Sequence, residues 1–412
     1  MARAGLGSGW ECLFANDIDP KKGASYAANW GDERLRVADI GALTTEEIPA
    51  HADLAWASFP CQDLSLAGNG AGLKGKRSGT FWRFWSHIEA LAQQGRGPSL
   101  VVLENVCGAL SSHNGTDFTA IGAALARAGY RFGAVVIDAV HFVPQSRPRL
   151  FIVSVRRDRN IHPSLTTSQP NSAWRPPRLI SAYEQLSPAS KDAWLWWNLP
   201  AVPSRNCRFA DVIENEPRSV RWHSAAETAR LLEMMSEINR QKVERARRKE
   251  HRIVGSVYRR TRTEGGKRVQ RAEIRFDDVA GCLRTPGGGS SRQSIMIMEG
   301  ATIRSRLLSP RETARLMGLP DSYQLPETYN EAYHLAGDGV VVPVVRFLAT
   351  HLLEPLLAPG KEEERVHANI QKLSANLRPQ GYEQLATPQK EAVSRSRTRR
   401  QKELPRHIRN QR

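Results

Sequence analysis

The sequence predicts an α/β fold, a doubly wound and mostly parallel sheet accompanied by a smaller basic domain. Three features of the chain lead to this prediction. Short apolar runs alternate with helical patterns from residue 10 to residue 155. The alternation stops in residues 156–303, which are richer in Pro, Arg, Ser and Trp, and apolar order returns in residues 307–357. Alternating strands and helices are typical of a parallel sheet covered by helices.

Short apolar runs bounded by turn residues are predicted to be buried strands, and the longer segments between them to be helices. The strands are expected at residues 11–15, 53–57, 100–103, 134–137 and 150–153. Helices are expected at residues 79–93 and 117–128. Ligands of such folds bind at the carboxyl ends of the strands, so the residues that follow these runs are the first site candidates.

The composition limits the class of protein. A hydrophobic content of 40% with 10 Trp excludes a chain that is disordered throughout. No apolar run reaches the roughly 18 residues of a membrane-spanning helix, and the N-terminus lacks the apolar segment of a secretory signal. The 5 Cys are scattered and odd in number, which does not make a disulfide framework and indicates a reducing, intracellular setting.

The charge balance favours an acidic partner, with nucleic acid as the leading candidate. Lys and Arg number 59 against 42 Asp and Glu, a formal net charge of +17. The alternative is a basic tail that inflates the average. Residues 359–412 form such a tail, predicted to be disordered and Arg-rich at 394–400. Residues 240–275 are also dense in Arg and Lys, so the tail does not account for the whole surplus.

The sharpest local feature is the cysteine at position 61, directly after the strand expected at 53–57. A lone cysteine is more often a small buried hydrophobe. Here Pro60 precedes Cys61 and a polar loop follows it, which favours an exposed nucleophile. A working thiolate at neutral pH would need help from nearby cations or a helix N-terminus.

Two further polar features follow other strands. Glu104 comes after the apolar run at 100–103, where burial would favour its protonated form; a capping or salt-bridging role is the alternative. Arg147 and Arg149 alternate just before the last strand and are expected to point to the same face. Two guanidiniums side by side are costly unless they meet an anion or carbonyl groups; a generic solvated stripe of arginines is the alternative.

Together these residues resemble the DNA cytosine-5 methyltransferases. The ordered segments that carry the resemblance are Pro60-Cys61-Gln62, Glu104-Asn105-Val106 and Gln145-x-Arg147-x-Arg149. Further matches are residues 16–20, 38–40, 77–81, 308–322 and 337–343. Each tripeptide is weak alone, but the ordered set is specific and spans residues 5–357 apart from a variable insert. The resemblance implies a Rossmann-like fold that uses S-adenosylmethionine.

The resemblance implies a mechanism. Cys61 would attack C6 of a cytosine flipped out of the duplex, Glu104 would hold N3, and Arg149 with Arg147 would hold O2. C5 would then take the methyl group. The glycine-containing loop at 62–77 would close over the base.

The resemblance also implies a cofactor site. Asp17 would bind the ribose hydroxyls of S-adenosylmethionine, Ile18 would pack on its adenine, and Asp39 would accept from the adenine amino group. The alternative for both aspartates is ordinary turn chemistry. The remaining cofactor contacts implied by the family motifs are Ile40, Pro60 and Asp338. No metal is implied.

The basic middle segment corresponds to a target recognition domain. The domains are expected at 1–156 (catalytic), 157–302 (recognition), 303–358 (return to the catalytic domain) and 359–412 (basic tail). The glycine turn at 286–289 would approach DNA; a phosphate-binding nest is the alternative, but the Gly-Lys-Ser/Thr ending of such loops is missing. Implied DNA contacts are Gln62, Ser65, Gln145, Arg284 and Arg292. Residues 194–197 (WLWW) are expected in the core or a domain interface rather than stacked on bases.

Two departures from the family pattern are present. Asp338 stands where the family carries Asn, which adds charge near the cofactor. The first strand and its Phe-x-Gly-x-Gly turn are expected to be missing, because Gly5, Gly7 and Gly9 precede a strand instead of following one. We therefore expect weak cofactor binding by the chain as written.

The sequence leaves three functions open. The first is a DNA cytosine-5 methyltransferase (EC 2.1.1.37) whose start lies upstream or whose N-terminal fragment is supplied separately. The second is a truncated relative that binds DNA with little or no methylation, and a third, weaker option is an RNA cytosine-5 methyltransferase. The expected setting is bacterial-type cytoplasm, with double-stranded DNA as partner and no membrane. We expect a monomer, which could be paired with a cognate restriction endonuclease.

Overall fold

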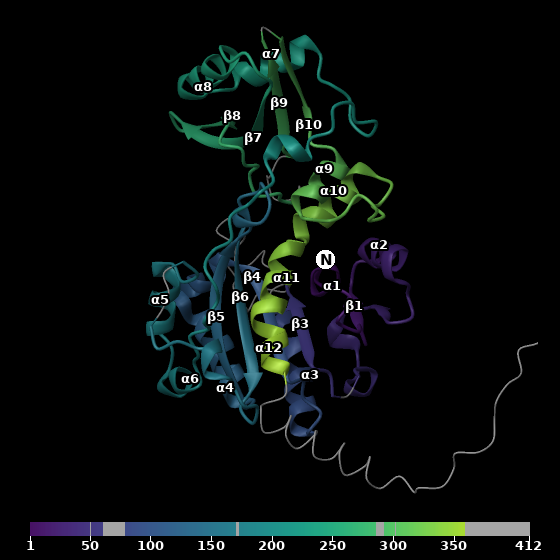
Figure 1. The fold of residues 1–412 in the computed structure, drawn as a ribbon, viewed down its shortest axis with the longest axis vertical. Helices are drawn as coiled ribbons and strands as arrows, with labels where there is room; N and C mark the ends of the chain where they lie inside the picture. The colour runs from purple at the N-terminus through teal and green to yellow at the C-terminus, as the bar shows by residue number, and fades with distance from the viewer. Residues whose placement is uncertain (50, 61–78, 170–172, 286–291, 301, 359–412) are drawn as a thin grey trace, which may run out of the picture. The chain divides into compact units, whose positions relative to one another are not determined.

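Three sheets organise the described part of the chain (Figure 1). The computed structural model describes residues 1–49, 51–60, 79–169, 173–285, 292–300 and 302–358. The predictions for Cys61, Gln62 and Ser65, for the glycine turn at 286–289 and for the tail lie outside these residues.

A four-stranded sheet forms the centre of the fold, in the order β3-β4-β6-β5. β3 (Leu54–Ser58) runs parallel to β4 (Leu100–Val106). β6 (Pro148–Arg156) runs antiparallel to both β4 and β5 (Tyr130–Asp138). The predicted α/β class is confirmed, and β6 is the reversed strand of this sheet.

Alternation along β4 explains how the sheet is buried on both faces. Leu100 and Val102 point into one core cluster, and Val101 and Leu103 into another. Helices on the first face are α11 (Val342–Leu348) and α12 (Glu354–Leu357), while α9 (Pro310–Leu316) and α10 (Tyr329–Asp338) lie nearer the third sheet (Figure 1). Helices on the second face are α3 (Thr80–Gln93), α4 (Thr116–Arg127) and α5 (Pro177–Glu184). The expected helices at 79–93 and 117–128 are thus α3 and α4.

A second, parallel pair of strands lies near the N-terminus. β1 (Ala15–Asp17) pairs with β2 (Leu35–Val37), and α2 (Pro20–Trp30) connects them. The strand predicted at 11–15 is wrong in its bounds, since the extended pairing begins at Ala15. Within the described residues, no ladder joins this pair to the central sheet.

The N-terminal helix α1 (Ala2–Leu6) packs against α11. Gly5 makes this approach possible, because a Cβ at this position would lie 2.4 Å from the Cβ of Val345.

The third sheet belongs to the basic middle segment. Its strand order is β10-β9-β7-β8, with all neighbours antiparallel. The strands are β7 (Ile253–Glu264), β8 (Lys267–Arg275), β9 (Ser294–Glu299) and β10 (Thr302–Leu307), and the helices beside them are α7 (Ala225–Glu233) and α8 (Glu237–Arg247). The sheet has a hydrophobic cluster of its own. The last strand of this sheet, β10, runs from Thr302 to Leu307.

The segment that follows β6 packs on the central sheet instead of joining the basic one. Phe132 of β5 forms a bridge with Trp194, and Trp197 donates to the carbonyl oxygen of Val153 in β6. α5 and α6 (Pro188–Asp192) belong to this segment. The core position expected for residues 194–197 is confirmed for Trp194 and Trp197.

The stretch Tyr329–Leu357 has the length and apolar composition of a membrane-crossing helix. Val344, Leu348, Leu352 and Leu356 within it are buried in the core cluster that lines the central sheet. Packing against this sheet therefore accounts for its apolar composition.

Candidate active site

Four candidate residues lie at carboxyl ends of parallel strands, two in the β1–β2 pair and two in the central sheet. Asp17 ends β1, Asp39 follows β2, Pro60 follows β3, and Glu104 lies near the end of β4. This is the edge at which α/β folds bind ligands.

Glu104 and Arg149 form a buried ion pair. Glu104 lies within β4 and not after a strand as expected, because the pairing with β6 continues to Val106. The Nε of Arg149 lies 3.3 Å from Oε1 of Glu104, with 15% and 7% of the two side chains exposed. A carboxyl group and a guanidinium are therefore presented side by side with little access for water.

Arg147 has a different environment. It is 2% exposed, and its guanidinium donates to the carbonyl oxygens of Leu283, Gly337 and Gly339 at 2.7–2.8 Å. Two adjacent guanidiniums were expected to need an anion or carbonyl groups. Arg149 has the anion, Glu104, and Arg147 has the carbonyl groups. These carbonyl groups bind the guanidinium of Arg147 and give it a positioning role, and its predicted contact with a base stays a prediction.

Gln145 also joins distant segments. It is fully buried, its Nε2 donates to the carbonyl oxygen of Leu316, and its Oε1 accepts from the backbone N–H of Leu283. Both ends of this buried amide are bonded within the protein, as buried polar groups usually are. Gln145 therefore holds two segments together, and its predicted DNA contact stays a prediction.

Asn105 is a positioning residue. It belongs to the motif Glu104-Asn105-Val106, but no role was predicted for it. Its Nδ2 donates to the carbonyl oxygen of Phe59 at 3.1 Å, and its Oδ1 accepts from the N–H of Val106. Asn105 thus fixes the end of β3, where Phe59 and Pro60 precede the cysteine. Its place beside Glu104 in the motif was the available signal.

The thiol of Cys282 was also missed. Arg147 donates to its sulfur from 3.4 Å. Burial acts to raise the pKa of Cys282, but the guanidiniums of Arg147 and Arg149 outweigh burial, and the pKa is lowered. This contact could not be predicted, because residues 147 and 282 are far apart in the chain.

The end of β1 combines a carboxylate with an exposed apolar side chain. Oδ1 of Asp17 accepts from the N–H of Asp19, which orients the carboxylate. Ile18 is 65% exposed, which is unusual for a large aliphatic residue and offers a surface for a flat ring. These features fit a nucleoside, with a carboxylate for the ribose diol and Ile18 for the base.

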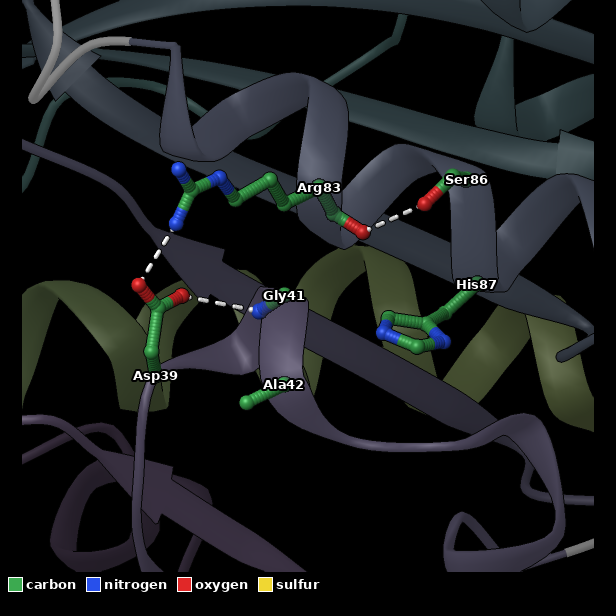
Figure 2. Close-up of a pocket in the computed structure, with 6 residues that line it drawn as sticks. All are labelled: Asp39, Gly41, Ala42, Arg83, Ser86 and His87. Carbon is green, nitrogen blue, oxygen red and sulfur yellow. Dashed lines mark hydrogen bonds and ion pairs between the residues drawn. The ribbon is translucent and has the colours of Figure 1, made fainter.

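A polar pocket lies beside Asp39, between the turn that follows β2 and the helix α3 (Figure 2). Its volume is about 440 Å³. The lining residues are Asp39, Gly41, Ala42, Arg83, Ser86 and His87. The pocket is large enough for part of a nucleotide cofactor.

Asp39 is held in this pocket from two sides. Its Oδ1 accepts from the N–H of Gly41 at 2.8 Å, and its Oδ2 pairs with Arg83 at 2.5 Å (Figure 2). The Gly41 N–H, and after it Arg83, lowers the pKa of Asp39. His87 also bonds the carbonyl oxygen of Ile40, so α3 fixes the turn through two side chains, neither of which was singled out from the sequence.

Asp338, at the end of α10, connects three segments. It pairs with Lys22 of α2 at 2.8 Å and accepts a hydrogen bond from the hydroxyl of Thr285. Burial acts to lower the pKa of Lys22, but the carboxylate of Asp338 outweighs it, and the pKa is raised. Gly337 permits this contact, because a Cβ there would lie 2.8 Å from the backbone nitrogen of Thr285.

The remaining described candidates lie at the surface or near it. Pro60 and Arg284 are exposed. Arg292 bonds the side chain of Asn330, and its guanidinium lies 5.6 Å from the centre of the Tyr329 ring. Among the described residues, no group of three or more His, Cys, Asp or Glu could hold a metal ion.

The fold is that of a methyltransferase. Dnmt2 of S. pombe superposes with a TM-score of 0.50 at 18% identity, covering 84% of this chain and 92% of that protein. A DNMT2 mutant of Spodoptera frugiperda also superposes with a TM-score of 0.50 at 16% identity, covering 86% of this chain and 94% of that protein.

The sequence identifies the family within this class. The chain belongs to the C-5 cytosine-specific DNA methylase family, which matches residues 2–354. Type II methyltransferase M.HhaI of Haemophilus parahaemolyticus is 27% identical over 348 residues, 84% of this chain and 88% of that protein. Type II methyltransferase M.DsaV of Dactylococcopsis salina is 26% identical over 381 residues, which cover 91% of this chain and 90% of that protein.

Proposed function

We propose that the protein transfers a methyl group from S-adenosylmethionine to C5 of a cytosine in double-stranded DNA. The observation that carries the proposal is the buried pair of Glu104 and Arg149 at the carboxyl edge of the sheet. Cytosine presents N3 and O2 on one edge. A carboxyl group beside a guanidinium matches that edge, with Glu104 at N3 and Arg149 at O2.

Cys61 is the proposed nucleophile. Its thiolate would form a bond to C6, the electron pair of the C5–C6 double bond would shift to C4–C5 and that of C4–N3 to N3, and N3 would take a proton that Glu104 receives from water and passes on. C5 would then take the methyl group that bound S-adenosylmethionine supplies, with S-adenosylhomocysteine as the other product, and N3 would return its proton to Glu104. Water would then remove the C5 proton, and the electrons of that C–H bond would restore the C5–C6 double bond and expel the thiolate of Cys61. Asn105 supports this step by fixing the strand end before Cys61.

The base must leave the helix before it can react, because stacking and pairing shield C6 in the duplex. Flipping costs a few kcal/mol, which contacts to the extruded base offset. Glu104 and Arg149 supply such contacts in a site where little water competes.

The proposed cofactor contacts follow from the fit described above. S-adenosylmethionine supplies an electrophilic methyl group when it is bound. Asp17 holds the ribose hydroxyls, Ile18 packs on the adenine, and Asp39 accepts from the adenine amino group next to the backbone of Ile40. Asp338, which pairs with Lys22, and Pro60, which follows β3, are the further proposed contacts.

The basic sheet is the proposed recognition domain, with Arg284 and Arg292 in the connection between β8 and β9. Arginine and lysine neutralise phosphates, so DNA affinity should fall steeply with salt. We propose that the protein works as a monomer on DNA in a bacterial cytoplasm. A cognate restriction endonuclease is the proposed partner enzyme.

The test is transfer of tritium-labelled methyl groups by the purified full chain to duplex DNA and, in parallel, to RNA. Label in 5-methylcytosine of DNA is expected. Cys61→Ser should abolish both transfer and the covalent complex with a 5-fluorocytosine duplex. Cys207→Ser is the matched control and should keep both.

Each other outcome counts against the proposal. An adduct that survives Cys61→Ser removes this cysteine from the mechanism. Label in RNA alone selects the RNA methyltransferase, and DNA binding without transfer selects an inactive relative.

A further inference from the structure

The hairpin of β7 and β8 extends beyond the sheet to which it belongs. β9 pairs with β7 only over residues 253–257, whereas the β7–β8 ladder continues to Glu264 and Lys267. Gly265 and Gly266 close the hairpin with φ of 55° and 78°, the conformation that a two-residue hairpin turn requires. Residues 258–273 therefore form a two-stranded ribbon.

The two faces of this ribbon continue different sides of the sheet. On one side, Val254 and Ser256 lie on the same face as Arg260, and Val254 belongs to the core cluster that also lines the central sheet. On the other side, Val257 and Ala272 belong to the cluster under α7 and α8 (Figure 1). We call these the core-side face and the helix-side face.

The core-side face carries a surplus of positive charge. Its exposed end presents Arg260, Arg262, Lys267 and Arg271 against the carboxylates of Glu264 and Glu273. Arg260 and Arg262 share Glu273: its carboxylate lies 3.8 Å from Nε of Arg260 and 3.1 Å from Nε of Arg262. One carboxylate cannot neutralise two guanidiniums, so this pair keeps a net positive charge.

The arginine pair is also held in place. The guanidinium of Arg260 lies 4.8 Å from the centre of the Tyr258 ring, and Glu273 fixes Arg262. Each guanidinium has five N–H donors, more than these contacts use. About half of each side chain is exposed, at 51% for Arg260 and 49% for Arg262. The free donors can therefore reach an anion.

We propose that the core-side face of the ribbon binds the phosphate backbone of the DNA substrate, with Arg260 and Arg262 as its main contacts. This inference rests on the proposed function and names the element that holds the substrate. Two arguments select duplex DNA. A two-stranded ribbon fits the width of the major groove, and paired guanidiniums bind phosphate oxygens through parallel hydrogen bonds.

The test compares two double variants with the same change in net charge on opposite faces of the ribbon. Arg260→Gln/Arg262→Gln alters the core-side face, and Arg259→Gln/Arg268→Gln alters the helix-side face. Binding of a fluorescent 30-base-pair duplex of mixed sequence is measured by anisotropy at several salt concentrations. The core-side variant should bind about tenfold to a hundredfold more weakly, and its salt slope should fall by about 2. The helix-side variant should bind within about threefold of the wild type.

Equal losses in the two variants, or a larger loss in the helix-side variant, overturn the inference. If the core-side double variant is less stable to heat, Arg260→Gln alone repeats the test, because Arg262 then still pairs with Glu273. Methyl transfer by the wild type is measured on the same duplex. If methyl transfer is detected but the two double variants bind DNA equally, the role of the ribbon is refuted and the proposed function stands. If the variants differ in DNA binding but no methyl transfer is detected, the proposed function is refuted and the role of the ribbon stands.

Discussion

The guanidinium of Arg147 donates to the carbonyl oxygen of Gly337 at 2.7 Å, across 190 positions of the chain. The same side chain bonds the carbonyl oxygens of Leu283 and Gly339. One arginine thus joins the start of β6, the connection between β8 and β9, and the end of α10. Its partner in the motif, Arg149, faces the Glu104 carboxylate instead.

The two arginines should respond differently to replacement by lysine. Arg147→Lys should lower the free energy of unfolding by about 2–4 kcal/mol, because one ammonium cannot reach carbonyl groups on three segments. Arg149→Lys should lower kcat for DNA by about tenfold or more, with a smaller change in stability. Urea unfolding and methyl transfer measure the two effects. Equal destabilisation by both changes would refute the positioning role.

A second prediction concerns the buried pair of Arg306 and Glu312. Neither side chain is exposed, and two hydrogen bonds of 2.6 and 2.8 Å join them. Glu312→Gln should destabilise the fold by about 3–5 kcal/mol, since it leaves a buried guanidinium without its counter-ion. Urea unfolding tests this. The exposed pair of Arg304 and Glu216 is the control, and Glu216→Gln should leave the midpoint unchanged. A similarly small effect of Glu312→Gln would contradict the prediction.

The pocket beside Asp39 gives a third prediction. Asp39→Asn should weaken binding of S-adenosylmethionine by about tenfold, because the charge-assisted hydrogen bond to the adenine amino group is lost. Arg83→Gln should change the affinity less than about threefold, since the N–H of Gly41 still orients the carboxylate. Calorimetric titration measures both. A larger loss for Arg83→Gln than for Asp39→Asn would place the cofactor elsewhere.

The ion pair of Lys22 and Asp338 should appear in the pH dependence of stability. The pKa of Lys22 is raised above its usual 10.5, so its contribution is complete below that value and disappears as the pH rises through the raised one. Both side chains are partly exposed, so Asp338→Asn should cost only about 0.5–1 kcal/mol at neutral pH. Thermal unfolding should show this difference near pH 8 and a smaller one above the raised pKa. A difference that does not change with pH would contradict the assignment.

The strands of the central sheet could be predicted because strands buried on both faces require continuous apolar runs. The run at 100–103 marked β4 for this reason, although the strand continues through Glu104 to Val106. The strand at 11–15 was misplaced because β1 is only three residues long and partly exposed, which leaves a weak apolar signal. The antiparallel direction of β6 cannot be predicted from the composition of the strand.

The candidate site was predicted in part. Residues at the carboxyl ends of β1 to β4 were located by their position after or within a strand. The partners of Gln145 and Arg147 within the protein could not be predicted, because whether a polar side chain meets a distant carbonyl group depends on which segments folding brings to it. The contacts of Arg83 and Cys282 were not predicted, because neither residue belongs to a motif.

The sequence by itself determined the fold class, the family and the strand-end positions of Asp17, Asp39, Pro60 and Glu104, because these depend on local apolar patterns and on ordered motifs. The tertiary structure alone decided that Arg149 pairs with Glu104 while Arg147 and Gln145 hold segments together. It also decided that Arg260 and Arg262 share one carboxylate on one face of a ribbon. The physical reason is the same in each case: hydrogen bonds and ion pairs form between groups that folding brings within about 3 Å, whatever their separation along the chain.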